Sequence, residues 1–197
     1  KADWVNKFEK EGTYKETFTD INGDESEIDF MHQAADFKYY ENGDTKAVKL
    51  PYENGLSMVV VLGDTKNILN DIQNNKMTSK LVDVSLPKFK AEYSIDYVNI
   101  LKNMGIEKAF DNQNADFSLM LENYPERIKI DSVLQKAMID VDEKGTEAAA
   151  ATVAVLTKSA LSVDEEVIEF RADKPFTYYI LDDSGNVYFA GRYVKAE

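Results

Sequence analysis

The sequence contains no cysteine and only one histidine, His32, among its 197 residues. Without cysteine the chain has no disulfide, zinc–thiolate site, iron–sulfur cluster or thiol nucleophile. We expect His32 to be a structural or exposed residue, because metal sites need several convergent ligands. No carboxylate pair, nucleophile–base arrangement or phosphate-binding glycine loop stands out in the sequence either. We therefore expect a protein that is not an enzyme and that uses no metal or other cofactor.

Positive charge is also scarce. The sequence has 23 Lys and Arg residues and 36 Asp and Glu residues, which gives a net charge of −13. Such a field repels phosphate groups, so we expect no nucleic acid partner. No apolar run approaches the roughly 20 residues of a membrane span. The acidic run from Asp20 to Glu25 lacks the glycine position and the final glutamate of a calcium loop, so we expect a solvated turn there.

What the sequence does contain is typical of a folded core, with 44% apolar and 11% aromatic residues. This composition argues against disorder, and the length fits one substantial core or two small domains. Four turn dipeptides between β-rich stretches predict antiparallel hairpins. They are Asn22-Gly23, Asn42-Gly43, Asn54-Gly55 and Ser184-Gly185. The predicted strands cover residues 37–40, 45–50, 56–62, 81–92, 128–142, 176–181 and 187–194.

Two short helices are expected beside these strands. Asp64 or Thr65 is the predicted cap of the first, which places Ile68, Leu69 and Ile72 on one face. Ser94 is the predicted cap of the second, and Gly105 is its predicted end. The apolar face of this second helix would consist of Tyr97, Val98, Leu101 and Met104.

Residues 143–169 fit neither pattern. Read alone, the four alanines that follow Glu147 indicate a helix capped by Thr146. The alternative is a long segment between two strands, which in a compact domain is usually functional. Every second residue from Thr146 to Ala154 is small, so one face of this segment could enter a sheet without displacing core side chains.

The motifs around this segment occur in a recognisable order along the chain. They are Trp4, Leu50-Pro51-Tyr52, Leu86-Pro87-Lys88-Phe89, Leu101-Lys102-Asn103-Met104-Gly105, Ala109-Phe110, Ala115-Asp116-Phe117-Ser118, Lys136-Ala137, Phe170-Arg171-Ala172-Asp173-Lys174-Pro175-Phe176 and Phe189-Ala190-Gly191-Arg192. Together they resemble the serpin family of serine protease inhibitors, of the prokaryotic type. The family's inhibitory hinge is matched by Glu143, Lys144, Gly145, Thr146, Glu147, Ala148, Ala149, Ala150, Ala151 and Thr152.

The resemblance implies an α+β serpin fold, made mainly of antiparallel β-sheets A, B and C with a few short helices and a long reactive loop. Residues 1–197 would be the C-terminal part of a single serpin domain, with the hinge and reactive-centre loop at 143–169. The N-terminal helical half of the same domain would be a partner of this chain. One departure is Gln135, where the family often has histidine; it puts a pH sensitivity of sheet opening in doubt.

The resemblance further implies a suicide inhibitor that traps a serine protease, or a cysteine protease, as a covalent acyl-enzyme. The family's spacing places the scissile bond at Ser159-Ala160, whereas counting back from Phe170 moves it as far as Leu161. Small residues there suit elastase-like or subtilisin-like proteases, and Lys158 suits a trypsin-like protease if the register shifts by one. We expect an extracellular, cell-surface or periplasmic location, with the cytoplasm as the alternative. The alternative function is a non-inhibitory relative that binds, stores or assists folding.

Overall fold

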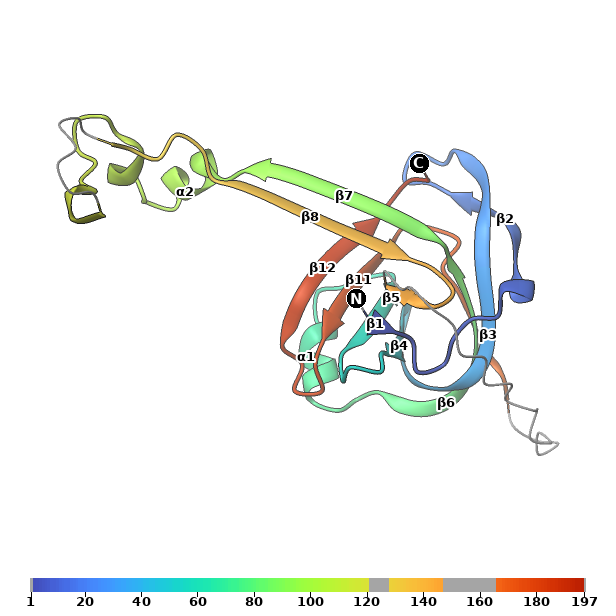
Figure 1. The fold of residues 1–197 in the computed structure, drawn as a ribbon. Helices are drawn as coiled ribbons and strands as arrows, with labels where there is room; N and C mark the ends of the chain where they lie inside the picture. The colour runs from blue at the N-terminus through green and yellow to red at the C-terminus, as the bar shows by residue number, and fades with distance from the viewer. Residues whose placement is uncertain (1, 121–127, 147–165, 197) are drawn as a thin grey trace. The chain divides into compact units, whose positions relative to one another are not determined.

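The computed structural model describes residues 2–120, 128–146 and 166–196 (Figure 1). The chain divides into two compact units, which we describe separately. The first contains residues Lys1–Lys90 and Ile139–Glu197, and the second contains Ala91–Met138. The predicted hinge residues Glu147, Ala148, Ala149, Ala150, Ala151 and Thr152 and the predicted reactive-bond residues Lys158, Ser159, Ala160 and Leu161 lie outside the described residues.

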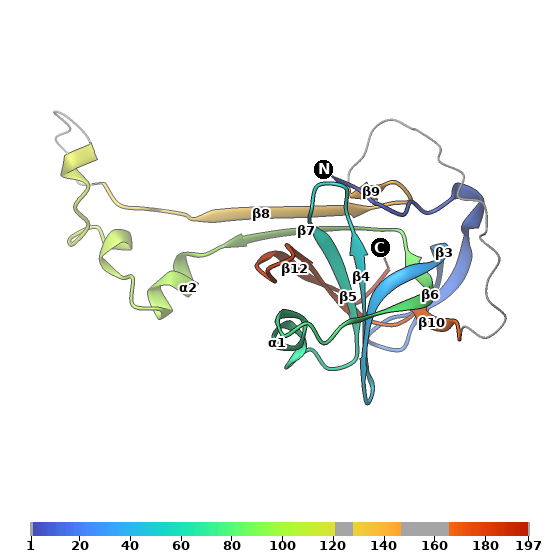
Figure 2. The same ribbon diagram turned by 90° about the horizontal axis from the view of Figure 1, so that it is seen from below.

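An eight-stranded sheet forms most of the first unit (Figures 1 and 2). Its strand order is β10-β6-β3-β4-β5-β11-β12, and β2 pairs with β3 beside this path. The strands are β2 (Thr13–Thr19), β3 (Glu25–Asn42), β4 (Thr45–Pro51), β5 (Ser57–Leu62), β6 (Thr78–Pro87), β10 (Ile168–Arg171), β11 (Phe176–Leu181) and β12 (Val187–Tyr193). All pairings are antiparallel except that of β10 with β6.

The predicted hairpin turns are confirmed. Gly23, Gly43, Gly55 and Gly185 all have positive φ, a conformation that costs glycine little because it has no Cβ. The predicted solvated turn is confirmed at residues 21–24, which are exposed, whereas Asp20 is buried and its Oδ1 accepts the N–H groups of Asn22 and Asp24. The carboxylate thus closes the turn from inside, an arrangement favoured for aspartate at the start of a turn.

A smaller sheet contains β1 (Ala2–Asp3), β9 (Gly145–Thr146), β8 (Leu134–Val141) and β7 (Phe89–Asp96), in that order. The prediction of one strand over 81–92 is wrong, because β6 ends at Pro87 and β7 begins at Phe89, and the two strands belong to different sheets. The predicted strand over 128–142 begins later, at Leu134. Just before that point the Val133 N–H donates to a side-chain oxygen, Asp96 Oδ1 at the end of β7.

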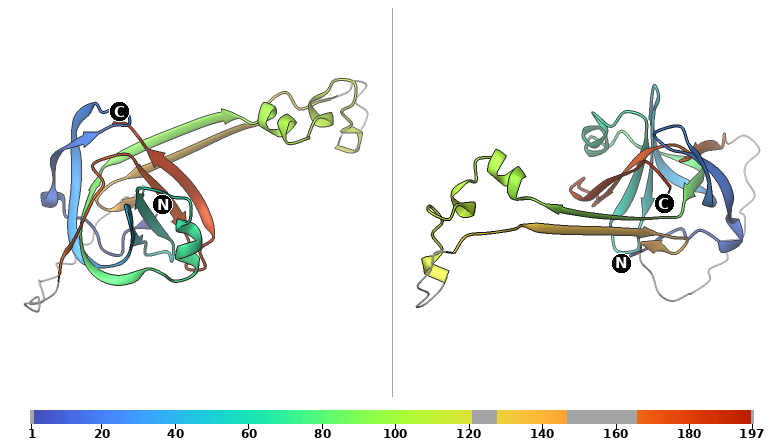
Figure 3. Two further views of the ribbon diagram at one scale, coloured as in Figure 1. Left: turned by 180° about the vertical axis from the view of Figure 1, so that it is seen from behind. Right: turned by 90° about the horizontal axis from the view of Figure 1, so that it is seen from above.

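The core of the first unit is apolar on both sides of the eight-stranded sheet. In β5, all of Met58 to Val61 are buried, which explains why this strand has an unbroken apolar sequence. The helix α1 (Ile68–Gln73) packs Ile68, Leu69 and Ile72 against one face, as predicted (Figures 2 and 3). The predicted caps are wrong: Asn67 occupies the N-cap without a side-chain bond.

The second unit is built around α2 (Val98–Asn103), with the single turns η2 (Lys108–Phe110) and η3 (Ser118–Met120). The predicted end at Gly105 is confirmed by its positive φ of 93°. The predicted cap Ser94 lies in β7 instead, and Asp96 Oδ1 accepts the N–H of Val98 at the helix start. Of the predicted apolar face, Tyr97, Val98 and Leu101 are partly buried, whereas Met104 is 74% exposed. None of the helices in the described ranges is long and apolar enough to cross a membrane.

Candidate functional site

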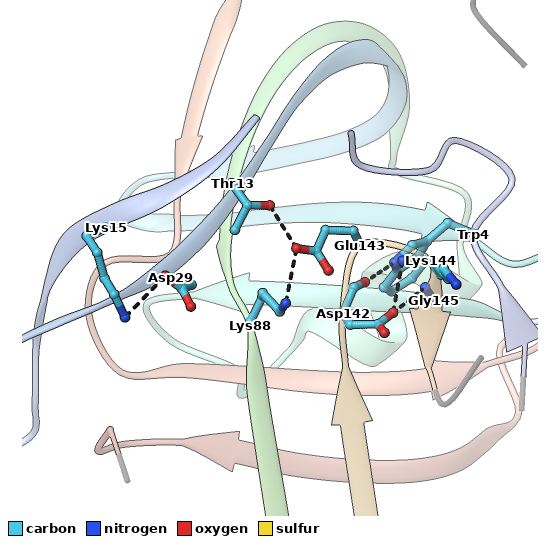
Figure 4. Close-up of polar contacts among 9 residues, drawn as sticks. All are labelled: Trp4, Thr13, Lys15, Asp29, Lys88, Asp142, Glu143, Lys144 and Gly145. Atoms are coloured by element: carbon cyan, nitrogen blue, oxygen red, sulfur yellow. Dashed lines mark hydrogen bonds and ion pairs between the residues drawn. The ribbon is translucent and has the colours of Figure 1, made fainter. Parts of the chain in front are cut away.

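The candidate site is the turn of residues 142–146, which links β8 to β9 and contains the predicted hinge residues Glu143, Gly145 and Thr146 (Figure 4). Asp142 Oδ1 accepts the N–H groups of Lys144 at 2.9 Å and Gly145 at 3.1 Å. The Asp142 N–H donates to the carbonyl of Gly145 at 3.0 Å. The aspartate therefore fixes the reversal of the chain at the end of β8.

The short strand β9 is paired on both sides. Thr146 pairs with Val141 of β8 and with Ala2 of β1, and Gly145 pairs with Asp3. A Cβ on Gly145 would lie 2.7 Å from the Asp3 Cα and closer still to the carbonyl oxygen of Ala2. Glycine is thus required here by the close approach of the β1 backbone.

Trp4 covers the turn and is only 1% exposed. Its indole Nε1 donates to the carbonyl of Asp142 at 3.0 Å, and its backbone N–H donates to the carbonyl of Lys144 at 2.9 Å. Its ring stacks on Tyr52 with centroids 4.3 Å apart. The Tyr52 hydroxyl shares a 2.7 Å hydrogen bond with Thr146 Oγ1, and burial raises the pKa of Tyr52. A buried aromatic pair therefore holds both ends of the turn.

Glu143 is a buried carboxylate, 6% exposed, with one partner in β2 and one between β6 and β7. Its Oε1 accepts hydrogen bonds from Thr13 Oγ1 of β2 and Lys88 Nζ, each at 3.1 Å (Figure 4). Burial by itself raises the pKa of Glu143, but hydrogen bonds from its own N–H, Lys88 and Thr13 outweigh burial and lower the pKa overall. Glu143 is therefore an ionised, paired group at neutral pH.

The sequence did not predict the partners of these hinge residues. Thr13 lies 130 residues and Lys88 lies 55 residues from Glu143 along the chain, so no local spacing connects them. The motifs around Trp4, Tyr52 and Lys88 marked their positions but not their contacts. Asp142, which shapes the turn, directly precedes the matched hinge and has the Asp-x-x-Gly pattern of a tight turn.

In the sheet order of the described residues, β8 lies between β7 and β9, and on its β9 side Val141 pairs with Thr146. Thr146, the last described residue before the gap, lies on this side of β8.

No conventional catalytic or metal centre is found in the described ranges. No group of three or more His, Cys, Asp and Glu residues there could hold a metal ion. The ring of His32 stacks on that of Tyr14 with centroids 4.2 Å apart.

Comparisons with known proteins agree with this arrangement. A serpin-like protein of Thermococcus kodakarensis is 37% identical over 98% of this chain and 47% of its own length. The native structure of the thermophilic serpin tengpin has a TM-score of 0.81 and 30% identity, covering 100% of this chain and 53% of tengpin. Thyroxine-binding globulin, solved in complex with thyroxine, has a TM-score of 0.80 and 25% identity, covering 99% of this chain and 54% of its own.

The chain thus spans about half the length of the curated relatives it matches. The predicted α+β serpin fold is confirmed by the structural neighbours. The sequence model of the serpin family, described as serine protease inhibitor, matches residues 1–196. Because that match covers nearly every residue, the chain belongs to the serpin family.

Proposed function

We propose that the protein of which this chain is part inhibits a target protease by the suicide mechanism of inhibitory serpins. The loop at 143–169 is offered as a substrate. The nucleophile of the protease attacks the carbonyl carbon of the residue before the scissile bond, and the new amino terminus leaves. The loop residues up to the cut remain joined to the protease through an ester, or through a thioester if the protease uses cysteine.

In the next step, the cut loop enters the sheet that contains β8 as an added strand. Pairing of backbone groups and burial of apolar area drive this step. The uncut protein is therefore held in a kinetic trap above its lowest free energy. Insertion must be faster than hydrolysis of the acyl-enzyme, because otherwise the protease is released intact.

The observation that carries this proposal is the sequence that follows the anchored turn. From Thr146 to Ala154, every second residue is Thr or Ala, and no charged residue or proline occurs between Ala148 and Leu156. Small side chains add little volume to a sheet that must accept them. The turn supports the proposal because Val141, the last residue of β8, pairs directly with Thr146 at the start of this sequence.

We place the scissile bond at Ser159-Ala160, with Lys158 and Leu161 as the alternatives. The corresponding target is an elastase-like or subtilisin-like serine protease, or a trypsin-like one if cleavage follows Lys158. The proposed location is outside the cell, where such proteases are met. The 143–169 segment belongs, in this proposal, to a single domain completed by the N-terminal half.

Incubation of the full-length protein with a panel of serine proteases tests the proposal. We expect one or more proteases to form a complex that survives boiling in denaturant, together with a released peptide that begins at Ala160 when cleavage follows Ser159. Sequencing of that peptide identifies the bond. Cleavage by every protease without a stable complex would favour the alternative, a non-inhibitory serpin that binds a ligand, as thyroxine-binding globulin does.

A further inference from the structure

A second polar cluster surrounds His32 in the first unit, away from the turn at 142–146. His32 lies in β3, and its Nδ1 shares a 3.0 Å hydrogen bond with Ser85 Oγ of β6. Its ring lies parallel to that of Tyr14 of β2, with an interplanar angle of 2°. These contacts fix the ring, whose side chain is 15% exposed.

The other ring nitrogen, Nε2, is buried and has no hydrogen-bond partner. It faces Glu16 of β2, whose Oε2 lies 3.8 Å away, too far for a hydrogen bond. The same Oε2 accepts a 2.7 Å hydrogen bond from Arg171 Nη2, at the end of β10. One carboxylate oxygen thus stands between the imidazole of β3 and the guanidinium of β10.

The groups around the His32 cluster, charged and uncharged, come from β2, η1, β6 and β10. β2 contributes Glu16 and the Tyr14 ring, and η1 (Lys10–Gly12) approaches through the Gly12 backbone. On β6, Asp83 lies opposite Ala34 of β3, two residues from His32, and Glu169 of β10 lies opposite Asp83. Asp173 and Glu169 act on Arg171. Of these acidic groups, Glu16 is the one whose carboxylate faces the His32 ring, at 3.8 Å.

We propose that His32 is a pH-dependent clamp that ties β10 to the β2–β3 ribbon. When His32 is neutral, its Nε2 makes no bond and Glu16 holds Arg171 alone. When His32 takes up a proton, both ring nitrogens become donors, so Nδ1–H bonds to Ser85 and Nε2–H bonds to Glu16. Glu16 then bridges two cations on separate strands.

The direction of the pH effect on the clamp follows from which protonation state of His32 bonds to Glu16. Protonated His32 gains a second hydrogen-bond partner in the folded arrangement, so the clamp is closed when the ring is protonated and open when the ring is neutral. β10 is held to the sheet by its parallel pairing with β6 and by the Arg171–Glu16 contact. As the strand that follows the reactive segment in sequence, β10 anchors the C-terminal end of that segment.

Hydrogen exchange on the full-length protein tests the clamp. The reporter is the N–H of Ala172, which donates to the Ser85 carbonyl at 2.9 Å, and the reference is the N–H of Tyr179 in β11. Protection factors, which remove the intrinsic pH dependence of exchange, are compared at pH 5.5 and pH 8. We expect protection at Ala172, relative to Tyr179, to rise about threefold to tenfold at the lower pH, the range of a partly buried ion pair.

His32→Gln should abolish this rise. Glu16→Gln leaves the Tyr14–His32 stack intact and should also abolish the rise in protection at Ala172. The test therefore stands even if the histidine variant does not fold. Glu27→Gln, which removes an exposed carboxylate of the same ribbon, should keep the full rise. Equal protection at both pH values in the wild type, or a rise that persists in Glu16→Gln, would overturn the clamp.

Discussion

At the scale of single residues, the most unusual group is Glu143, a carboxylate held out of water at the start of a long loop. Burial of a charge is unfavourable unless the charge is paired and hydrogen-bonded. Lys88 and Thr13 supply that pairing, and the Phe8 N–H binds the Glu143 carbonyl at 3.0 Å. The position of the hinge thus depends on contacts with segments distant in sequence.

Replacing Glu143 by Gln should lower the free energy of unfolding by about 2 kcal/mol, because Thr13 and Lys88 lose a charged acceptor in a buried place. Thermal unfolding of the full-length variant measures the change. The matched control is Asp29→Asn, which removes the exposed ion pair between Lys15 and Asp29 at 3.2 Å. That control should change stability by less than about 0.5 kcal/mol. Equal losses in the two variants would contradict a special role for Glu143.

The Glu143 contribution should also depend on pH. Its pKa is lowered from the ordinary value of 4.5, so the stabilisation is complete above pH 4.5 and is lost as pH falls through the lower pKa of the folded state. Asp71 and Asp96 also have lowered pKa values, so the wild-type acid transition alone does not isolate Glu143. The difference in thermal midpoint between wild type and Glu143→Gln isolates it. That difference should shrink steadily below pH 4.5, and a constant difference down to pH 2.5 would refute this assignment.

At the scale of elements, the strands were easier to predict than the helix starts. The hairpins follow from local turn chemistry, because Asn-Gly and Ser-Gly allow the positive φ that tight turns need. Residues 81–92 divide into β6 and β7 because the two halves join different sheets. No local sequence pattern predicts which sheet a strand joins. The α2 start uses Asp96 instead of Ser94, since tertiary pairing extends β7 past the serine.

The turn at 142–146 likewise combines features that the sequence predicts with contacts that depend on the folded topology. Glu143, Gly145 and Thr146 were predicted through the family resemblance, and the structure places them in one turn. Their partners Thr13, Lys88 and Tyr52 come from three other segments, so their contacts arise only from the folded topology. The alternating small residues after Thr146 and the reactive bond remain predictions from sequence.

Thr146→Arg should convert the protein from an inhibitor into a substrate. Arginine at the first small position would slow strand insertion, so the protease would cleave the loop and then hydrolyse the acyl-enzyme. The measurement is the ratio of denaturant-stable complex to cleaved protein on a gel, and we expect the complex to fall at least about tenfold, which corresponds to 1.4 kcal/mol in the competing barriers.

Two matched variants separate the effect of side-chain size at residue 146 from the effect of its hydrogen bond to Tyr52. Thr146→Ser keeps the hydroxyl that bonds to Tyr52 and should preserve the complex. Tyr52→Phe removes the other side of that bond without adding bulk, and it should leave most of the complex intact. Survival of the complex in Thr146→Arg would show that the proposed insertion does not begin at this residue.

At the scale of the whole molecule, the central claim is that the uncut protein is kinetically trapped. A sheet gains stability when a strand is added to it, because backbone groups pair and apolar area is buried. The stored free energy should therefore appear when the loop is cut.

The most direct test is the thermal midpoint of the full-length protein before and after cleavage of the loop by a non-target protease that does not form a complex. We predict that cleavage raises the midpoint by about 10 °C or more, because several kcal/mol of added strand pairing correspond to such a shift. In Thr146→Arg the rise should be smaller. A cleaved wild-type protein with an unchanged or lower midpoint would contradict loop insertion and, with it, the proposed mechanism of inhibition.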